Sequence, residues 1–422
     1  MHDLAHVLDG GASIRRSRLR RDAGLVAPSV GAAAVAAAAI YLATVTRTHV
    51  PSWRDVAIVA SSLALLPVII SFLLLSLRDN GQPLTLAGLM TVSTSALVVA
   101  VLSALRLHIS YWGVLLAAIP VALAMIVVML QLRRAENDSV ALLAFDGAET
   151  VRGRLGTDVA IADGTDADLR AYDRFLIDAA HHSGRWSRFL LRAHMRGIPV
   201  TPWMQFLEQR HGRVDIASFD IADVVLRPGQ IVYSRVKRIF DLGGALLALP
   251  VALLAGGLVG LYILLAAGRP VLFRQKRRGH GGETFIIVKF RTMRTDADSR
   301  PASENDDRVV PALRAVRRLR LDEIPQLYNI LRGEMSWIGP RPATVEVAEA
   351  TEAVEPKFAS RLLVRPGLTG WAQVNAAYAS TVAEEIEKLG YDLYYVKNMS
   401  FDLDLIIMAR TVKTLLLRRG AR

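Results

Sequence analysis

Four long uncharged stretches dominate the first third of the chain. They cover residues 25–46, 56–77, 80–105 and 107–132, and each holds 22 residues or more without a formal charge. At about 1.5 Å of helical rise per residue, such a stretch reaches roughly 33 Å, which is enough to cross the hydrocarbon core of a bilayer. Helices buried in a soluble core are usually shorter and amphipathic. The pattern therefore predicts a membrane bundle of four transmembrane helices over residues 25–132.

A fifth uncharged stretch, 242–268, differs from the other four because Pro250 lies within it and basic residues flank it on both sides. A crossing helix would place one basic flank on the outer face of the membrane, which basic loops avoid. A helix bent at the proline could instead dip into one leaflet and return. We therefore predict a re-entrant membrane helix over 235–268, with its kink at Pro250.

Basic residues also predict the orientation of the chain. Five arginines lie between residues 15 and 21, before the first stretch, and Arg133 and Arg134 follow the fourth. Loops rich in Lys and Arg tend to stay in the cytoplasm, although the short loops between the stretches are less decisive here. We expect a basic cytoplasmic N-terminus over 1–24 and a cytoplasmic C-terminal part.

Residues 133–234 change to short apolar runs separated by helical stretches. The runs begin at Val140 and Asp158, and one helical stretch begins at Arg185. Strands alternating with helices are typical of a parallel sheet whose strands are buried on both faces. The pattern predicts a small Rossmann-like α/β domain. Because no G-x-G-x-x-G phosphate loop accompanies it, dinucleotide binding is not supported, and a scaffold or regulatory role is favoured.

Composition narrows the possible chemistry. The 422 residues include no cysteine, which excludes thiolate zinc sites, iron–sulfur clusters and disulfides, so any metal must bind oxygen or imidazole. Lys and Arg exceed Asp and Glu by 51 to 39. This excess suits an anionic membrane face or a phosphorylated substrate. Nucleic acid is disfavoured because the cations flank membrane stretches and do not form a basic stripe interleaved with aromatic residues.

Basic residues are numerous in residues 269–422, and two of them lie on one predicted strand. The run 284–293 alternates in polarity, so Lys289 and Arg291 should project from the same face, where they could bind a phosphate. An exposed edge strand with solvated charges is the alternative.

Two adjacent acids, Asp322 and Glu323, follow an arginine-rich stretch and precede Pro325 at the start of a predicted helix. Helix capping and the helix dipole could account for both acids. In the functional alternative, one carboxylate attacks phosphorus, the other holds Mg²⁺, and nearby arginines neutralise the phosphate oxygens. The residues alone leave both alternatives open.

Three further segments carry candidate features. Arg341 lies between Pro340 and Pro342, which stiffen its loop. Glycines 367 and 370 permit either close approach of a ligand or ordinary turns. The stretch 401–422 has apolar residues at helical spacing, so it could lie on an anionic membrane surface or pack on its own domain.

The segments KFRTM, SENDDR, LDEIPQLYNILRGEMSWIGPRP, RPGLTGWAQVN and YDLYYVKN together resemble, in order and spacing, the bacterial sugar transferase family, from about residue 236 to residue 422. These are the monotopic phosphoglycosyl transferases that begin exopolysaccharide and O-antigen synthesis. The four preceding stretches and the small α/β domain are similar, in architecture only, to the large polyprenyl-phosphate hexose-1-phosphate branch. The resemblance implies a catalytic α/β domain over 269–422, anchored by the re-entrant helix and ending in an amphipathic helix.

The resemblance also implies a reaction. A hexose 1-phosphate would pass from a UDP-hexose to undecaprenyl phosphate in the bacterial inner membrane, through a covalent aspartyl phospho-sugar intermediate and with release of UMP. Asp322 would be the nucleophile and Glu323 the Mg²⁺ ligand. The residues that match the family's phosphate-binding basic positions are Lys289, Arg291, Arg317 and Arg341. The residues that match motif elements whose role in the site stays open are Asn305, Asp306, Arg308, Pro340 and Pro342.

Two positions depart from the family pattern. Arg320 stands where a small hydroxyl residue is usual, which leaves the capping of the next helix open, and Leu249 replaces a common serine before Pro250. A catalytically silent membrane scaffold or regulator of polysaccharide assembly is the alternative function, but the intact motifs favour the enzyme. The sequence leaves open which hexose is used, glucose and galactose being common in the family, and whether the chain forms a homodimer.

Overall fold

The chain divides into two compact units, Met1–Leu207 and Glu208–Arg422. The computed structural model describes residues 2–46, 52–76, 83–135, 139–156, 158–179, 184–223, 228–294, 307–376 and 381–416. Two of the expected site residues, Asn305 and Asp306, lie outside these ranges.

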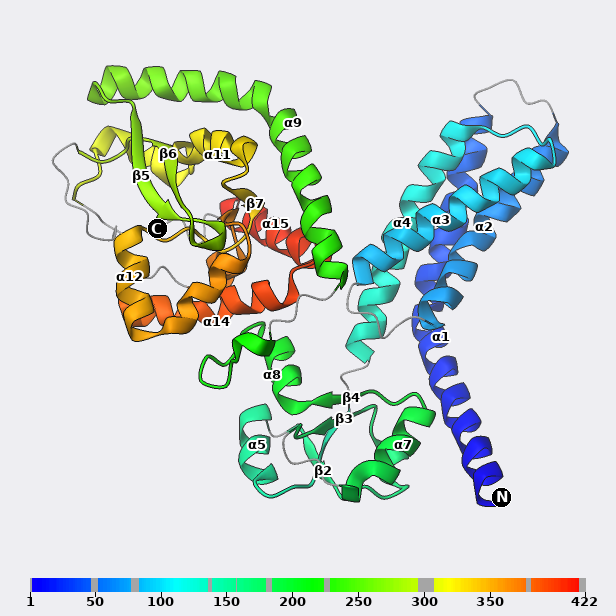
Figure 1. The fold of residues 1–422 in the computed structure, drawn as a ribbon. Coiled ribbons are helices and arrows are strands. Elements are labelled where there is room, and N and C mark those ends of the chain that lie inside the picture. The colour runs from blue at the N-terminus through cyan, green and yellow to red at the C-terminus, as the bar shows by residue number, and fades with distance from the viewer. Residues whose placement is uncertain are drawn as a thin grey trace. The chain divides into compact units, whose positions relative to one another are not determined.

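Long apolar helices open the first unit, as Figure 1 shows in blue and cyan. They are α1 (His2–Val45), α2 (Trp53–Ser76), α3 (Pro83–Ala104) and α4 (Tyr111–Ala135). Each contains a stretch long and apolar enough to cross a membrane: Arg21–Val45, Trp53–Leu75, Leu84–Ala104 and Tyr111–Leu132. The helices pack on one another around Tyr41, Leu63, Ile70 and Met125, which are almost fully buried. The sequence prediction of several apolar helices in this region is confirmed.

A parallel sheet follows in the same unit. Its strands are β1 (Val140–Leu143), β2 (Ala160–Ala162), β3 (Arg174–Ile177) and β4 (Val200–Pro202), in the order β2-β1-β3-β4. Alternate residues of β1 enter two different clusters, because Leu142 packs with Trp203 and Phe206 while Leu143 packs with Phe189. Burial on both faces explains the uninterrupted apolar run. The helices between the strands are α5 (Ala148–Leu155), α6 (Asp168–Ala171), η1 (Gly184–Trp186) and α7 (Ser187–Met195), and α8 (Trp203–His211) follows β4 and runs across the boundary between the units.

One long helix, α9 (Pro228–Ala267), carries the fifth apolar stretch in the second unit. The helix runs on past Pro250, which has no backbone N–H to donate, and Figure 1 shows it as two arms joined by a sharp bend. A proline inside a helix is a usual cause of such a bend. Only 11% of its most apolar window is buried within the protein, and Leu247 is 83% exposed. Leu249, by contrast, packs against the cluster that contains Phe285 and Ile287.

The rest of the second unit is an α/β part built from two small sheets and short helices. Strands β5 (Leu272–Arg278) and β6 (Thr284–Phe290) form an antiparallel hairpin, and β7 (Ser336–Ile338) pairs in parallel with β8 (Gly367–Thr369). The helical elements are η2 (Ile221–Asp223), η3 (His280–Gly282), η4 (Pro311–Leu313), α10 (Arg314–Arg318), η5 (Leu321–Gln326), α11 (Leu327–Arg332), α12 (Val345–Val354), η6 (Pro356–Leu363), α13 (Trp371–Asn375), α14 (Val382–Asn398) and α15 (Phe401–Leu416).

Helix α15 bears out one of the two alternatives expected for the C-terminal stretch, packing on its own domain. Leu403 and Ile407 are buried in a cluster with Tyr395, so one face packs on its own domain. Met408 and Val412 on the remaining surface are about half exposed. An amphipathic helix with an exposed apolar strip can also contact a lipid surface.

Candidate active site

Asp322 and Glu323 lie side by side in η5, a 3-10 segment that leads into α11. Both are buried, at 9% and 8% exposure. The residue before η5 is Arg320, which has a positive φ of 55° and makes no side-chain capping hydrogen bond. Asp322 is therefore not the N-cap that a purely structural explanation requires. Because burying a carboxylate is costly unless cations surround it, the neighbours of this pair define the site.

Three cations surround the Glu323 carboxylate. Arg341 Nη2 donates a hydrogen bond of 2.8 Å to Oε1, and Lys289 Nζ lies 4.0 Å from the same oxygen. Arg320 Nη1 lies 3.7 Å from Oε2. Burial alone would raise the pKa of Glu323, but the charges of Arg341, Lys289 and Arg320 outweigh it and lower the pKa to about 2. Glu323 is therefore an anion at neutral pH.

The pKa of Asp322 shifts in the opposite direction. Burial and the negative charge of Glu323 raise it to about 6, against the lowering effect of Lys289, Arg317 and Arg341. Adjacent carboxylates whose pKa values are pushed apart are typical of sites in which the two groups have different roles. The expected site residue Arg317 contributes here, because its positive charge lowers the pKa of Asp322.

Lys289 enters the site from the end of β6, beside the two acids. Burial and the charge of Arg341 lower its pKa to about 7, although Glu323 favours the charged form. The strand is fixed by Asn329 on α11, whose Oδ1 accepts from the Val288 amide at 3.2 Å and whose Nδ2 donates to the Ile286 carbonyl at 2.7 Å. Asn329 thus ties the strand that carries Lys289 to the helix that follows the acids.

Arg341 comes from a tight loop after β7. Glycines let the backbones of this loop and of β8 meet: a Cβ on Gly367 would lie 2.1 Å from the Gly339 nitrogen, and one on Gly370 would lie 2.2 Å from the Gly339 oxygen. Such distances exclude any side chain. The glycines at 367 and 370 therefore serve backbone packing next to the site.

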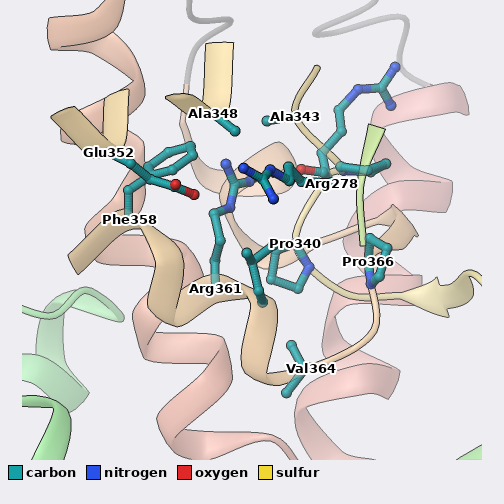
Figure 2. Close-up of a pocket in the computed structure, with 12 residues that line it drawn as sticks. Arg278, Pro340, Ala343, Ala348, Glu352, Phe358, Arg361, Val364 and Pro366 are labelled. Carbon is teal, nitrogen blue, oxygen red and sulfur yellow. The ribbon is translucent and has the colours of Figure 1, made fainter. Parts of the chain in front are cut away.

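A small pocket adjoins this loop. Figure 2 shows Arg361 extending into it from η6, with Phe358 on one side and Pro340 on the other. Arg341 and Arg278 also line it. The pocket thus borders the backbone of the residue that binds Glu323.

Other expected site residues have different partners. Arg291 lies just after β6 and is buried, and its Nη2 donates to the carbonyls of Ala267 and Gly268 at the end of α9, at 2.6 and 2.9 Å. The structure therefore brings Lys289, but not Arg291, to the Glu323 carboxylate. Arg308 is buried too, and its backbone carbonyl accepts from the Arg294 amide at 2.8 Å.

Two residues near the site have no counterpart in the expectations from sequence: Asn329 and Arg361. Neither belongs to a spacing that points to chemistry. The only signal is that a polar residue stands among apolar neighbours, in QLYNIL for Asn329 and in ASRLLV for Arg361.

The two carboxylates could hold a divalent cation. Among the described residues, no group of three or more His, Asp or Glu side chains gathers as a preformed metal cage. Mg²⁺ is usually held by one or two carboxylates together with substrate phosphates and water. An ionised Glu323 beside Asp322 fits that arrangement.

Comparison with known proteins identifies relatives along both units. Residues 232–418 match the family described as bacterial sugar transferase. The chain is 33% identical over 295 residues to the UDP-N-acetylgalactosamine-undecaprenyl-phosphate N-acetylgalactosaminephosphotransferase of Aeromonas hydrophila, a match that covers 69% of this chain and 70% of that protein.

Two shorter matches are to proteins named as glucose-1-phosphate transferases. The UDP-glucose:undecaprenyl-phosphate glucose-1-phosphate transferase of Caulobacter vibrioides is 41% identical over 204 residues, 46% of this chain and 76% of that protein. The enzyme of the same name from Escherichia coli is 37% identical over 159 residues, 36% of this chain and 34% of that protein. These matches confirm the resemblance found in the motifs, and the chain belongs to the bacterial sugar transferase family.

Proposed function

We propose that this protein transfers a hexose 1-phosphate from a UDP-hexose to undecaprenyl phosphate, as the first membrane step of exopolysaccharide or O-antigen synthesis. The observation that carries the proposal is the buried pair of adjacent carboxylates with opposite pKa shifts, set among Lys289, Arg341 and Arg320. The names of the relatives support the lipid acceptor and the sugar phosphate.

The proposed reaction has two displacements at phosphorus. First, an Asp322 oxygen attacks the sugar-bearing phosphorus, the bond to the bridging oxygen breaks, and UMP leaves. Second, an oxygen of undecaprenyl phosphate attacks the same phosphorus, the bond to Asp322 breaks, and the carboxylate is regenerated with undecaprenyl-diphosphate-hexose as product. Splitting one transfer into two steps through a covalent intermediate is a general strategy of nucleophilic catalysis.

The surrounding side chains explain how anions could meet there. Arg341 and Lys289 lie beside Glu323 and would neutralise phosphate oxygens as charge moves during each displacement. Arg341 is suited to this because its side chain is 35% exposed and can be reached by a substrate. Glu323, with Asp322 beside it, would hold Mg²⁺, which when bound supplies further positive charge to the diphosphate.

We further propose that α9 places this site at the membrane surface. Its first arm, which precedes Pro250, is tied to the α/β part of the second unit (residues 269–416), which we call the catalytic part. Lys237 Nζ lies 2.5 Å from Asp404 Oδ2, and Asp241 Oδ1 accepts from the Ser336 hydroxyl at 3.0 Å. The apolar remainder of the helix would enter the cytoplasmic leaflet and return at Pro250. The lipid phosphate would then lie at the level of the two acids.

Side-specific labelling tests this topology. Because the chain has no cysteine, single Arg235→Cys and Lys276→Cys variants place one thiol on each flank of the apolar stretch. An impermeant maleimide should reach both thiols in inverted vesicles and neither in intact cells. Labelling of the Lys276→Cys variant in intact cells would show that α9 crosses the membrane.

The reaction itself is tested with purified protein in lipid nanodiscs. We expect UMP to appear when Mg²⁺, undecaprenyl phosphate and one member of a UDP-sugar panel are present. Without the lipid acceptor, mass spectrometry should find a hexose phosphate on the peptide that contains Asp322. Absence of UMP with every sugar of the panel would favour a scaffold, and UMP release with an unmodified Asp322 peptide would exclude the aspartyl intermediate.

A further inference from the structure

The loop that carries Arg341 is held by hydrogen bonds to three successive backbone carbonyl oxygens. Pro340 and Pro342 lack backbone N–H groups, so this stretch has few donors of its own and is fastened through its carbonyl oxygens. The Pro340 carbonyl accepts from the Gly367 amide at 2.9 Å. The next two carbonyls accept from guanidinium groups: Arg361 Nη2 donates to Arg341 at 2.8 Å, and Arg277 Nη1 donates to Pro342 at 2.9 Å.

Arg361 is itself held firmly. It is 6% exposed, and the nitrogen that donates to Arg341 also lies 2.6 Å from Asp392 Oδ2 on α14. Its guanidinium lies over the ring of Phe358, 4.5 Å from the centroid, and Figure 2 shows the two side chains next to each other. A second carboxylate, Glu385, lies 3.9 Å away. A planar guanidinium held by carboxylates and an aromatic face has little freedom, and it therefore makes a rigid anchor.

These contacts join the interior of the catalytic part to the acid pair. Asp392 orients Arg361, Arg361 fixes the backbone of Arg341, and Arg341 donates to Glu323 at 2.8 Å. The Arg341 side chain is partly exposed, so its direction depends on how well its backbone is fixed. We propose that Arg361 is a positioning residue that holds Arg341 against Glu323 without touching the substrate. As a role in catalysis this rests on the proposed function, whereas the effect on Arg341 itself does not.

The test compares two matched variants. Arg361→Lys keeps the positive charge but loses the planar guanidinium, whose Nη2 contacts both Asp392 and the Arg341 carbonyl and whose Nη1 lies near Glu385. Arg278→Lys is the control, because Arg278 lines the same pocket but its guanidinium binds the Gly282 carbonyl at 3.2 Å and lies 3.6 Å from the exposed Glu349. Each variant is treated with phenylglyoxal in the full-length protein, and the modification rate of Arg341 is measured by peptide mass spectrometry.

We expect Arg341 to react about three- to tenfold faster in Arg361→Lys, since roughly one hydrogen bond no longer restrains it. The rate should be unchanged in Arg278→Lys. The modification rate of buried Arg291, bound to the end of α9, should be the same in all proteins, which separates a local change from general loosening. Equal Arg341 rates in Arg361→Lys and the wild type would overturn the proposal, as would a parallel rise at Arg291.

Kinetics then separate positioning from the function proposed above. In Arg361→Lys, kcat should fall about tenfold to a hundredfold with KM nearly unchanged, because misplacement of a charged group weakens the transition state more than the bound substrate. An unchanged kcat despite faster modification would refute the catalytic role. If the wild type releases no UMP, the proposed function fails, but the modification rates still decide whether Arg361 fixes Arg341. If Arg361→Lys does not fold, Asp392→Asn should show a smaller rise at Arg341, and no rise would also refute the proposal.

Discussion

The parallel sheet of the first unit and the catalytic part of the second unit differ in how many charged side chains they bury. Among the described residues of 139–207, the buried charged side chain is Arg196, and the sheet is held by apolar clusters on its two faces. The second unit buries a large set: Glu208, Lys237, Asp241, Arg291, Arg308, Asp322, Glu323, Arg361, Asp392, Asp402 and Asp404. Both regions fold, but among the described residues the second unit buries many more ionisable side chains than the sheet region does.

The difference means that the second unit accepts the free-energy cost of burying charged side chains, which a fold held by apolar clusters does not need. Removing a charge from water costs several kcal/mol unless a partner lies close, as a general rule. The catalytic part meets this requirement with short ion pairs, such as Arg361 with Asp392 at 2.6 Å and Arg341 with Glu323 at 2.8 Å. Substitutions that remove the buried member of such a pair should therefore lower stability or activity strongly, whereas surface carboxylates around the sheet should matter little.

The largest expected contrast compares a carboxylate from each region. Asp322→Asn should lower UMP release by about 10³-fold or more, because an amide is a poor nucleophile at phosphorus. Asp146→Asn, at an exposed position just after β1, should leave turnover within about twofold. Initial rates at saturating UDP-sugar measure both. Full turnover by Asp322→Asn would show that Asp322 is not the nucleophile. A large loss in Asp146→Asn would show that surface carboxylates near the sheet also affect turnover.

The second largest effect is expected from removing the negative charge of Glu323. Glu323→Gln leaves Arg341 and Lys289 beside a neutral amide, so the Mg²⁺ concentration for half-maximal rate should rise about tenfold to a hundredfold. Glu349→Gln is the matched control, since Glu349 is exposed and pairs with Arg278. A Mg²⁺ titration of UMP release gives the midpoints. An unshifted midpoint in Glu323→Gln would remove Glu323 from the metal site.

Buried neutral polar groups give a smaller and purely structural contrast. Asn329→Leu should lower the free energy of unfolding by about 2–4 kcal/mol, because the Val288 amide and the Ile286 carbonyl lose their partner. In the sheet, Thr201 accepts from Arg174 Nη1 at 3.1 Å, and Thr201→Val should cost only about 0.5–1.5 kcal/mol. Urea titrations of the two variants in the same detergent compare them. Equal costs would mean that the two regions depend on buried polar contacts alike.

The smallest effect concerns the strained residue before the acids. Arg320 has a left-handed backbone, which asparagine adopts more easily, so Arg320→Asn should raise the free energy of unfolding by about 0.5 kcal/mol despite losing its contact with Glu323. Arg318→Asn in α10 should slightly lower it, because asparagine is a poorer helix former. The same titrations measure both. Destabilisation by Arg320→Asn would show that the contact with Glu323 outweighs the strain.

Much of the fold could be predicted because its signals are local. Uncharged length predicted the apolar helices, and the apolar run at Val140 predicted a buried strand. The site was only partly predictable. Lys289 and Arg291 are two positions apart, so the alternation of a strand predicts that both side chains lie on one face. However, β6 ends at Phe290, and the Arg291 side chain binds a carbonyl at the end of α9. Asn329 and Arg361 act through partners on other elements, for which a single sequence carries no periodic signal.

The pairing of Lys237 with Asp404 has a consequence for the order in which the protein matures. The two residues are 167 positions apart, so the lysine leaves the ribosome long before its carboxylate is synthesised. At about 5–20 residues per second, the delay is roughly ten to thirty seconds. During that interval Lys237 lacks its Asp404 partner, and the contact between α9 and α15 can form only after α15 has been made.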